Sequence, residues 1–491
     1  MPPAADSPAP LTRLATTVPG LDRVLGGGLV RGTTYLVAGP PGAGKTILTN
    51  QVCFGHAQAG GRAVYVTLLA ETNTRMLAQL QSLAFYSPTV LARTLHYFSA
   101  YKQLDTEGLG GLLTLLRAIL RDQQATLLVL DGVLPARLKA ESQLAYQEFL
   151  HNLSTAAEVL GCTLLLIAQT DHAYPQLEYT MMDGVLLLHD RLVGGRAVRE
   201  LQVLKLRGSG FLRGLHGLTI SDAGIRVFPR IETLYAAQVP GAPTGERLSL
   251  GGAQLDAMLG GGMRAGTATL VLGTPGSGKT LLGMQFLAAG AQQGEAGLMF
   301  GFFEPPDALV EAGERLGLQR TAFAEGGPIA LQWESGLAAS LDELAERLLG
   351  ALDARGMRRL VIDGLAGFQA ANVEPERLEG FLAALLTALR ERGVTTLITA
   401  ELRGWLGPAI EAPVGGLAPL VDGVLFLRHV ELHSQLTRLI SVLKLRASSY
   451  DSRIREFTIS DAGLAVAASF ASAEAVLTGI ARPLGPPPAQ P

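Results

Sequence analysis

The chain has 491 residues, of which 40 are basic and 43 acidic, and its net charge of −3 excludes a chain-wide electrostatic footprint for nucleic acid. Two cysteines, Cys53 and Cys162, are too few for a disulfide framework or a cysteine-rich zinc site, so we expect a reducing compartment. No stretch contains the roughly 18 apolar residues of a membrane helix, and the N-terminus has no signal peptide, so we expect a cytoplasmic protein.

Apolar runs rich in Val and Leu alternate with helical stretches along the first half of the chain. The runs that we read as strands lie at 35–39, 63–69, 126–131, 162–169 and 184–190. Helical spacing, as in GLLTLLRAILRDQ, fills the stretches between them. Continuous apolar strands with intervening helices indicate a parallel sheet that is covered on both faces. We therefore predict an α/β fold, with a mostly parallel sheet flanked by helices.

The chain contains an internal repeat. LDRVLGGGLVRGT at 21–33 returns as LDAMLGGGMRAGT at 255–267, and GPPGAGKT at 39–46 returns as GTPGSGKT at 273–280. VLDG (later VIDG), VLKLR and ISDAG follow in the same order in both halves. Matches in a constant order over nearly the whole chain predict two copies of one domain.

Domain boundaries follow from the repeat and from composition. We place the first domain at 1–235 and the second at 236–470. The segment 229–247 contains Pro, Gly and Thr and is the natural linker. Residues 471–491 are rich in Ala and Pro and cannot pack a core, so we predict a flexible tail there.

Each half carries one match to G-x-x-x-x-G-K-[ST], between an apolar strand and a helical pattern. Glycines in such a P-loop let backbone N–H groups surround phosphate oxygens at the start of a helix. Lys45 and Lys279 then supply charge at the β- and γ-phosphates, while Thr46 and Thr280 offer hydroxyls to Mg²⁺. A chance Gly-rich turn is the alternative, and two matches in register argue against it. The predicted nucleotide contacts are Gly42, Ala43, Gly44, Lys45, Thr46 and Ile47, and in the second half Gly276, Ser277, Gly278, Lys279, Thr280 and Leu281.

Asp131 and Asp363 each end an apolar strand after the P-loop. A carboxylate at the carboxyl end of such a strand is where the Walker B acid holds Mg²⁺. The alternative is an ordinary aspartate that caps the next helix. Because both aspartates are paired with a P-loop and repeated, we favour the metal role.

Lys205 with Arg207, and Lys444 with Arg446, are spaced by two residues within the repeated VLKLR. On a strand, both side chains of a pair project from the same face. Solvated charges on an edge strand are the alternative. Lysine is scarce, with six in the chain, so the repeated position favours a contact with the γ-phosphate, including one delivered from a neighbouring subunit.

Candidates for the hydrolytic group follow the second and the later strands. Glu71 and Glu304 come after the second strand of each half and could orient or deprotonate the attacking water. Glu71 could equally cap the helix that follows it. Gln169 and Glu401 end the strands LLLIAQ and TLITAE, where they could hydrogen-bond the water or the γ-phosphate.

These doubled motifs resemble the KaiC family, a RecA-like group whose members carry two fused ATPase domains. The resemblance covers roughly residues 15–230 and 248–480. It implies hexameric double rings with ATP and Mg²⁺ bound between subunits, and a KaiB-like or signalling protein as partner. Residues that align with contacts to ATP across that interface are Lys205, Leu206, Arg207, Lys444, Leu445 and Arg446. Further aligned nucleotide contacts are Ser209, Phe211, Ser221 and Asp222, where Phe211 replaces a polar residue.

Two departures from this family pattern concern chemistry. Family members normally have two consecutive glutamates after the second strand, and the first is usually assigned the catalytic role. We align that first position with Ala70 and Phe303. The clock protein phosphorylates its own adjacent Ser and Thr, and that pair aligns with Ala418 and Pro419, which have no hydroxyl. The resemblance therefore implies an ATPase without this autophosphorylation.

The function that we predict is an ATP-binding and ATP-hydrolysing double-domain ring protein that acts as a signalling or regulatory switch. A DNA-dependent RecA-type motor or recombinase is the second class, although the sequence has no added basic or helix-turn-helix module. A nucleotide-stabilised assembly protein with little turnover is the third.

Overall fold

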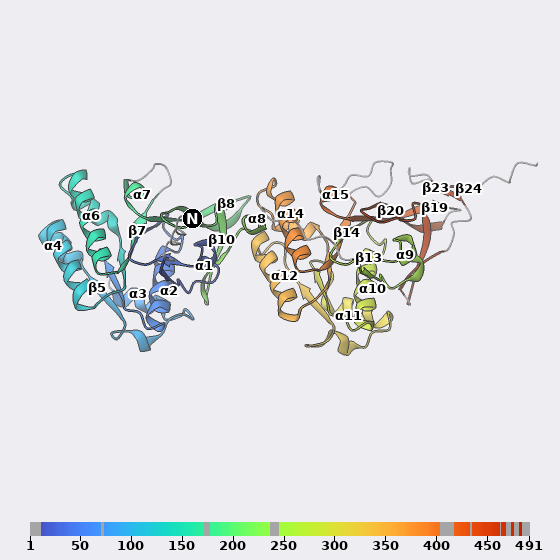
Figure 1. Ribbon diagram of the computed structural model, residues 1–491, viewed down its shortest axis with the longest axis horizontal. Coiled ribbons are helices and arrows are strands. Elements are labelled where there is room, and N and C mark those ends of the chain that lie inside the picture. The colour runs from blue at the N-terminus through green and yellow to red at the C-terminus, as the bar shows by residue number, and fades with distance from the viewer. Residues whose placement is uncertain are drawn as a thin grey trace, which may run out of the picture. The chain divides into compact units, whose positions relative to one another are not determined.

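The computed structural model describes residues 11–69, 73–170, 177–235, 245–402, 417–432, 435–461, 463–467, 473–475 and 481–483. The chain divides into two compact units, Met1–Thr233 and Leu234–Pro491. Figure 1 colours the first unit from blue to green and the second from yellow-green to red. Each unit has its own nine-stranded sheet.

The first unit is built on a sheet of order β11-β10-β9-β8-β3-β7-β6-β4-β5. Strands β5, β4, β6, β7, β3 and β8 run parallel, and β9, β10 and β11 complete the sheet antiparallel. The strands are β1 (Arg13–Leu14), β2 (Leu29–Val30), β3 (Thr34–Gly39), β4 (Ala63–Thr67), β5 (Leu95–Ser99), β6 (Leu127–Asp131), β7 (Thr163–Gln169), β8 (Gly184–Val193), β9 (Arg196–Leu206), β10 (Leu215–Ser221) and β11 (Gly224–Phe228). The helices are α1 (Leu21–Val24), α2 (Lys45–Gln58), α3 (Asn73–Leu80), η1 (Pro88–Val90), α4 (Tyr101–Asp122), α5 (Val133–Lys139), α6 (Gln143–Val159), α7 (Leu177–Met181) and α8 (Ile231–Tyr235).

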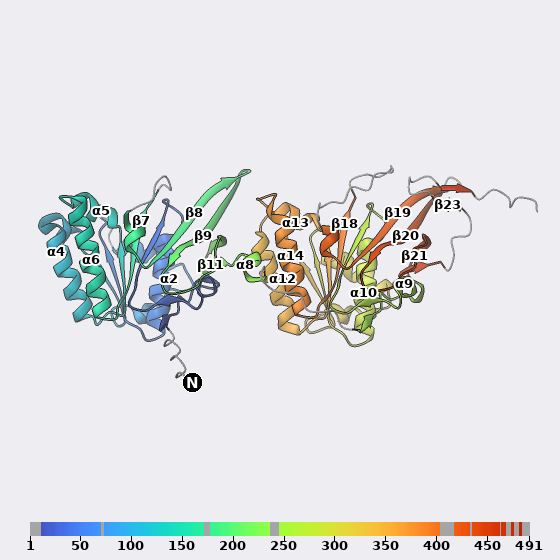
Figure 2. The same cartoon turned by 45° about the horizontal axis from the view of Figure 1, so that its top comes forward.

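Alternate side chains of the central strands enter two separate cores, because successive residues of a strand point to opposite faces. Tyr35 and Val37 of β3 pack in the core on the α2 face, and Leu36 and Ala38 pack in the core under α4 and α6. Figure 2 shows α2 on one side of the sheet and α4 and α6 on the other. This arrangement explains why the strands are apolar on both faces.

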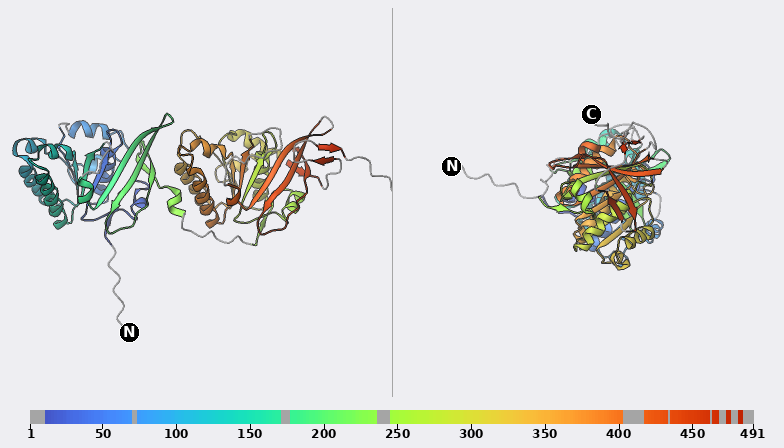
Figure 3. Two further views of the ribbon diagram at one scale, coloured as in Figure 1. Left: turned by 90° about the horizontal axis from the view of Figure 1, so that it is seen from above. Right: turned by 90° about the vertical axis from the view of Figure 1, so that its right-hand side faces the viewer.

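The second unit repeats the arrangement, with strand order β16-β15-β17-β18-β14-β19-β20-β21-β22. The strands are β12 (Arg247–Leu248), β13 (Met263–Arg264), β14 (Ala268–Gly273), β15 (Gly297–Gly301), β16 (Ile329–Trp333), β17 (Arg359–Asp363), β18 (Thr395–Glu401), β19 (Gly423–Leu432), β20 (Gln435–Leu445), β21 (Arg455–Ser460), β22 (Gly463–Val466), β23 (Ala473–Ala475) and β24 (Ala481–Pro483). The helices are α9 (Ala253–Met258), α10 (Lys279–Gln292), α11 (Pro306–Arg315), η2 (Arg320–Phe323), α12 (Leu341–Arg355), α13 (Ala366–Ala371), α14 (Arg377–Glu391) and α15 (Leu417–Leu420). In each unit a long antiparallel hairpin, β8–β9 or β19–β20, extends from the sheet (Figure 3).

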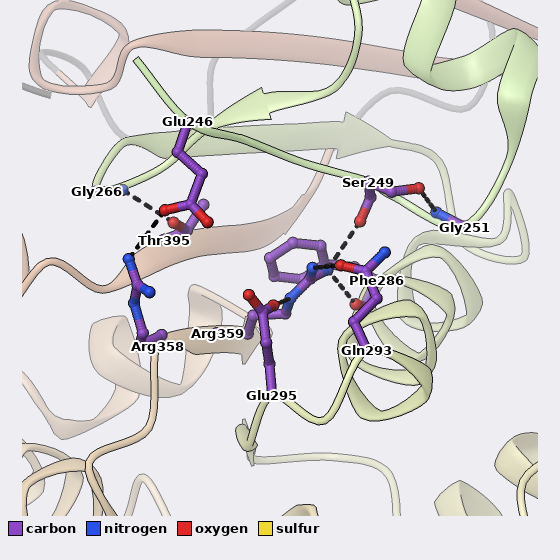
Figure 4. Close-up of polar contacts among 10 residues, drawn as sticks. All are labelled: Glu246, Ser249, Gly251, Gly266, Phe286, Gln293, Glu295, Arg358, Arg359 and Thr395. Atoms are coloured by element: carbon purple, nitrogen blue, oxygen red, sulfur yellow. Dashed lines mark hydrogen bonds and ion pairs between the residues drawn. The ribbon is translucent and has the colours of Figure 1, made fainter. Parts of the chain in front are cut away.

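A buried arginine distinguishes the second core from the first. Arg359, at the start of β17, is fully buried and donates to the Glu295 carboxylate at 2.5 Å. It also donates to the backbone oxygens of Ser249 and Phe286, at 2.8 and 2.9 Å (Figure 4). The same position of β6 holds Leu127, since Gly297 pairs with Arg359 as Ala63 pairs with Leu127. The guanidinium therefore links the C-terminal half of α10, which is the P-loop helix, to the sheet by hydrogen bonds.

The architecture confirms the predicted α/β class, with two tandem domains that are each a mostly parallel sheet flanked by helices. The segment expected as a linker contains α8, and β23 pairs with β24 within the segment expected as a tail. Among the helices of the described residues, none combines the length and hydropathy that a membrane crossing requires.

Candidate functional site

Both P-loops lie between the first central strand and its helix, as the motif predicts. Gly42 and Gly44 have φ of 80° and 98°, and Gly276 and Gly278 have φ of 72° and 94°. Side chains other than hydrogen are disfavoured at such angles, so glycine is needed there. The helices α2 and α10 begin at the next residue, and their first backbone N–H groups face the loop.

The two P-loop lysines are held by backbone oxygens of their own loops. Lys45 Nζ donates to the oxygens of Gly39 and Pro40, both at 2.8 Å. Lys279 Nζ donates to the oxygen of Thr274 at 2.9 Å. Burial is the main cause that lowers the pKa of both lysines. An ammonium that is poorly hydrated and close to a helix N-terminus is suited to bind phosphate oxygens.

The neighbouring loop residues complete this turn. Ala43 and Ser277 occupy the same loop position and are both buried. Thr46 lies in the first turn of α2, and Ile47 packs against the core of the first unit. Leu281 lines the cavity of the second site.

The second strand-end aspartate lies beside its P-loop. Asp363 is 7% exposed, and its Oδ2 accepts a hydrogen bond from Thr280 Oγ1 at 3.0 Å. Its Oδ1 accepts from Thr399 Oγ1 at 2.6 Å. Burial raises the pKa of Asp363, and the two hydroxyls oppose that rise. A hydroxyl and a carboxylate are thus in contact at the carboxyl edge of the sheet.

The first strand-end aspartate has a different partner. Asp131 is 6% exposed, and its Oδ2 accepts a hydrogen bond from Tyr65 Oη at 2.5 Å. Tyr65 lies on β4 and is completely buried. Burial and the negative Asp131 raise the pKa of the Tyr65 phenol well above 10, so the phenol is a permanent donor.

A cavity of about 390 Å³ surrounds the second P-loop. Such a volume is within the range of roughly 300–1,000 Å³ that is common for small-molecule sites. Its lining residues come from the P-loop, from the ends of β15, β17 and β18 and from the start of α13: Gly276, Gly278, Lys279, Thr280, Leu281, Phe303, Glu304, Asp363, Gly364, Leu365, Ala366, Thr399 and Glu401. The predicted P-loop, metal and carboxylate residues of the second half therefore line one cavity, apart from Ser277.

Gln169 and Glu401 lie at equivalent places. The strand register pairs Gln169 with Gly39 and Glu401 with Gly273, the first residue of each P-loop. A carboxylate oxygen of Glu401 is 3.5 Å from Lys279 Nζ, although the Glu401 side chain is 62% exposed. The second site thus carries a negative charge where the first carries a neutral amide.

The strand register changes the alignment of the second-strand glutamates. Thr67 pairs with Asp131 and Gly301 with Asp363, so Leu69 is the equivalent of Phe303. The packing agrees, because a Cβ on Gly132 would meet Leu69, and a Cβ on Gly364 would meet Phe303. Our alignment of Ala70 with Phe303 is therefore one residue out, since it assumed an extra residue after β4. Glu71 and Ala70 lie outside the described residues.

By this count Glu304 corresponds in sequence to Ala70, and Glu71 to Pro305. Glu304 is exposed and lines the second cavity. Phe303 is 65% exposed beside it, at the position expected for a catalytic glutamate.

The paired cations contact their own unit at a short helix. Lys205 Nζ donates to the backbone oxygens of Tyr179 and Thr180, at 3.2 and 3.1 Å. Arg207 also donates to the Thr180 oxygen, at 3.4 Å. In the second half, Lys444 donates to the oxygens of Ala418 and Val421, and Arg446 donates to that of Pro419.

These cations gather at α7 and α15, and the hydrogen bonds described above do not run to the P-loop of their own unit. A β-bulge precedes each lysine, between Val185 and Leu186 and between Val424 and Leu425 of the partner strands. Leu206 is buried and Leu445 partly buried, so both serve the core.

The other aligned residues lie in two loops. Ser209 accepts a hydrogen bond from Arg13 at 2.5 Å, and Phe211 packs against the core of the first unit. Ser221 ends β10 and Asp222 begins the turn to β11, and the neighbouring Ile220 of β10 is placed where it would meet a Cβ on Gly44. The end of β10 is therefore close to the first P-loop.

The donors fit a magnesium–nucleotide complex. Oxygen donors of Thr280 and Asp363 are the kind that Mg²⁺ prefers, and one carboxylate per site suits a metal that is also bound by phosphates. Within the described residues no three His, Cys, Asp or Glu side chains gather as an all-protein metal site. Ser277 Oγ is buried in the second P-loop and has no hydrogen-bond partner among the described residues, so this donor is available to a ligand.

Sequence reasoning missed two residues that position this chemistry, Tyr65 and Thr399. Both lie within strand runs, AVYVT and TTLITA, that contain other threonines, so no signal in the sequence singles them out.

Comparison with known proteins gives one consistent result. A family model described as the KaiC ATPase matches residues 14–232 and 249–470. The circadian clock oscillator protein KaiC of Picosynechococcus sp. is 26% identical over 481 residues, covering 95% of this chain and 92% of that protein. The protein of the same description from Synechococcus elongatus is 25% identical over 483 residues, covering 96% and 92%. Circadian clock protein KaiC3 of Synechocystis sp. is 25% identical over 500 residues, covering 96% and 94%.

Proposed function

The chain belongs to the KaiC family of ATPases, with two tandem RecA-like domains, and from that premise we propose that it is a nucleotide-driven ring protein that acts as a regulatory switch. The observation that carries the proposal is the second cavity, where a P-loop lysine, a threonine hydroxyl and a buried aspartate converge. We further propose domains at 1–235 and 236–470, a tail at 471–491 and a cytoplasmic location.

The chemistry of the second site is divided among its residues. Lys279 neutralises charge on the β- and γ-phosphates, and the N-terminus of α10 receives the phosphate oxygens. Thr280 and Asp363 would hold Mg²⁺, and the ion would supply positive charge that offsets the charge developing on the phosphates. Glu304 is the carboxylate that orients water. In the first site Lys45, Thr46 and Asp131 take the corresponding roles.

Assembly follows from the cations that contact α7 and α15. We propose that Lys205 and Arg207, and Lys444 and Arg446, reach the nucleotide of an adjacent subunit in a hexamer. Lys205, Lys444 and Arg446 donate to neutral backbone oxygens, which leave their positive charge uncompensated by those contacts. Arg207 also pairs with the Asp183 carboxylate, at 3.5 Å. A nucleotide at such an interface stabilises the assembled state by mass action.

The experiment is solution mass measurement with ATP, with ADP and without nucleotide, on the wild type and on Lys45→Ala. We expect ATP to favour a hexamer and Lys45→Ala to weaken both nucleotide binding and assembly. Monomer at saturating ATP, or an unchanged hexamer in the variant, would contradict the interface proposal. ATPase rates with and without DNA at two salt concentrations separate this switch from a DNA-dependent motor, whose activity would rise with DNA and fall with salt.

We also propose that the second domain does not phosphorylate itself. Ala418 and Pro419 have no hydroxyl, and residues 404–430 contain no Ser, Thr or Tyr. Water is then the acceptor, and Glu304→Gln slows its attack. Peptide mass spectrometry after incubation with γ-labelled ATP tests this, and stoichiometric phosphate on Ser or Thr of residues 248–470 would overturn it.

A nucleotide-stabilised assembly protein with little turnover is the second candidate. The observation that favours it is that the equivalent residues Leu69 and Phe303 occupy the position of the expected catalytic glutamate. Single-turnover hydrolysis in a Lys279→Ala background measures the first site alone. A rate indistinguishable from that of free ATP in solution would assign this site to assembly.

A further inference from the structure

The two halves hold their strand-end aspartates from opposite sides. Strand β6 lies between β4 and β7, and Asp131 is held from β4 by Tyr65 at 2.5 Å. Strand β17 lies between β15 and β18, and Asp363 is held from β18 by Thr399 at 2.6 Å. Since β4 corresponds to β15 and β7 to β18, the two donors come from opposite neighbours.

Neither hydroxyl donor has a polar equivalent in the other half. The strand register makes Met299 the equivalent of Tyr65, because Ala63 pairs with Leu127 as Gly297 pairs with Arg359. Ile167 is the equivalent of Thr399, because Gln169 and Glu401 both pair with the first P-loop residue. Each half therefore has an apolar side chain where the other half has its hydroxyl.

The first arrangement extends to the P-loop helix. The ring of Tyr65 packs on Tyr97 with centroids 5.4 Å apart, and Tyr97 donates to Asn50 Oδ1 at 2.8 Å. Asn50 donates in turn to the backbone oxygen of Thr46 at 2.8 Å. At the equivalent places the second half has Leu331 and Met284. The polar residues Tyr65, Tyr97 and Asn50 are thus all replaced by apolar residues in the second half.

We propose that Tyr65 is the positioning residue for Asp131 in the first nucleotide site, and that Thr399 does the same for Asp363. This rests on the proposed magnesium–nucleotide role of these sites. A hydrogen bond to one carboxylate oxygen fixes the rotation of the carboxyl group, so less reorganisation accompanies metal binding. Outer-shell donors of this kind are typically worth about 10–100-fold in metal affinity.

The experiment uses the full chain with Lys279→Ala, so that only the first site binds nucleotide. The affinity of a fluorescent ATP analogue is measured against free Mg²⁺, and again in EDTA. Tyr65→Phe keeps the ring and removes the hydroxyl, and we expect it to raise the Mg²⁺ concentration at half-saturation about 10–100-fold. The affinity in EDTA should stay within twofold of the parent, because the P-loop is untouched.

A matched control exists in the same domain. Tyr146 is also buried and donates to a buried carboxylate, Glu178, at 3.0 Å, but lies in the core under α4 and α6. Tyr146→Phe should leave the Mg²⁺ requirement unchanged. Adding Ile167→Thr to Tyr65→Phe rebuilds the arrangement of the second half, and we expect it to restore at least part of the Mg²⁺ affinity.

An unchanged Mg²⁺ requirement in Tyr65→Phe, or an equal shift in Tyr146→Phe, would overturn the inference. An equal loss of nucleotide affinity in EDTA would also overturn it, because Tyr65 would then stabilise the P-loop itself and not the Mg²⁺ site. If the parent chain itself binds nucleotide without any dependence on Mg²⁺, the proposed function fails instead, and the two failures are distinguishable.

Discussion

The carboxylate beside the second P-loop lysine offers the sharpest test of how nucleotide enters that site. Glu401 is 3.5 Å from Lys279 Nζ, whereas the first site has Gln169 at the equivalent place. Nucleotide phosphates must compete with Glu401 for the ammonium and are repelled by its charge. Glu401→Gln should therefore tighten nucleotide binding to the second site.

The magnitude follows from the geometry. Two unit charges about 3.5 Å apart interact by about 1 kcal/mol at the dielectric constant of water, which is appropriate because the Glu401 side chain is 62% exposed. Exposed pairs measure about 0.2–1 kcal/mol, which corresponds to a change of about 1.4- to 5-fold in Kd. Repulsion of the phosphates acts in the same direction, so we expect a value near fivefold.

The assay is titration with a fluorescent ATP analogue in a Lys45→Ala background, at two salt concentrations. The gain in affinity should shrink at high salt, because exposed charges are screened. Glu431→Gln, a removal of the same charge from an exposed position on β19, is the control and should have little effect. An unchanged or weaker affinity in Glu401→Gln would refute the reasoning and would instead assign Glu401 a direct part in binding.

Three further predictions concern stability and the loop. Glu295→Ala leaves the Arg359 guanidinium buried without its carboxylate (Figure 4), so the free energy of unfolding of the second domain should fall by about 3 kcal/mol. Tryptophan fluorescence reports this unfolding, since both tryptophans lie in the second half. Burial lowers the pKa of His56 to about 4, so the free energy of unfolding should fall by up to about 3 kcal/mol as pH drops from about 6.5 to about 4, and His56→Gln should flatten that slope in acid titrations followed by circular dichroism. Gly44→Ala puts a Cβ 2.7 Å from Ile220 at a φ of 98°, so the first site should lose nucleotide affinity at least tenfold in the same titration, while a loss below twofold would show that the loop adapts.

Much of the site could be predicted because its residues sit at fixed spacings along the chain. The glycines, lysine and threonine of a P-loop are consecutive, and Asp131 and Asp363 end strands that the apolar pattern delimits. Such spacings do not predict which residues of neighbouring strands pair with each other. Glu71 and Glu304 were matched by their similar distance from the P-loop lysine. The pairing of Thr67 with Asp131 and of Gly301 with Asp363 instead makes Leu69 the equivalent of Phe303.

The contacts across strands were also beyond the sequence. Tyr65 reads as an ordinary β-forming residue, and Thr399 as an ordinary residue of a buried strand. Only the order of the strands reveals that each lies beside a strand-end aspartate. The same holds for Lys205 and Lys444, whose strand is predictable but whose contacts to α7 and α15 depend on the tertiary structure.

Several differences between the halves concern the carboxyl edge of the sheet. The first half has neutral residues where the second has two carboxylates, with Gln169 in place of Glu401 and, in sequence, Ala70 in place of Glu304. In the first site Asp131 accepts a hydrogen bond from Tyr65, whose neighbours Tyr97 and Asn50 continue the contacts to the P-loop helix. Among the described residues the first site has fewer carboxylates than the second, and fewer carboxylates mean less repulsion of phosphate and fewer groups to activate water. The second site has Glu304 and Glu401 in its cavity, which weakens phosphate binding and supplies groups that can handle a proton. We therefore expect the first site to retain nucleotide longer than the second, although the fold of the two domains is the same.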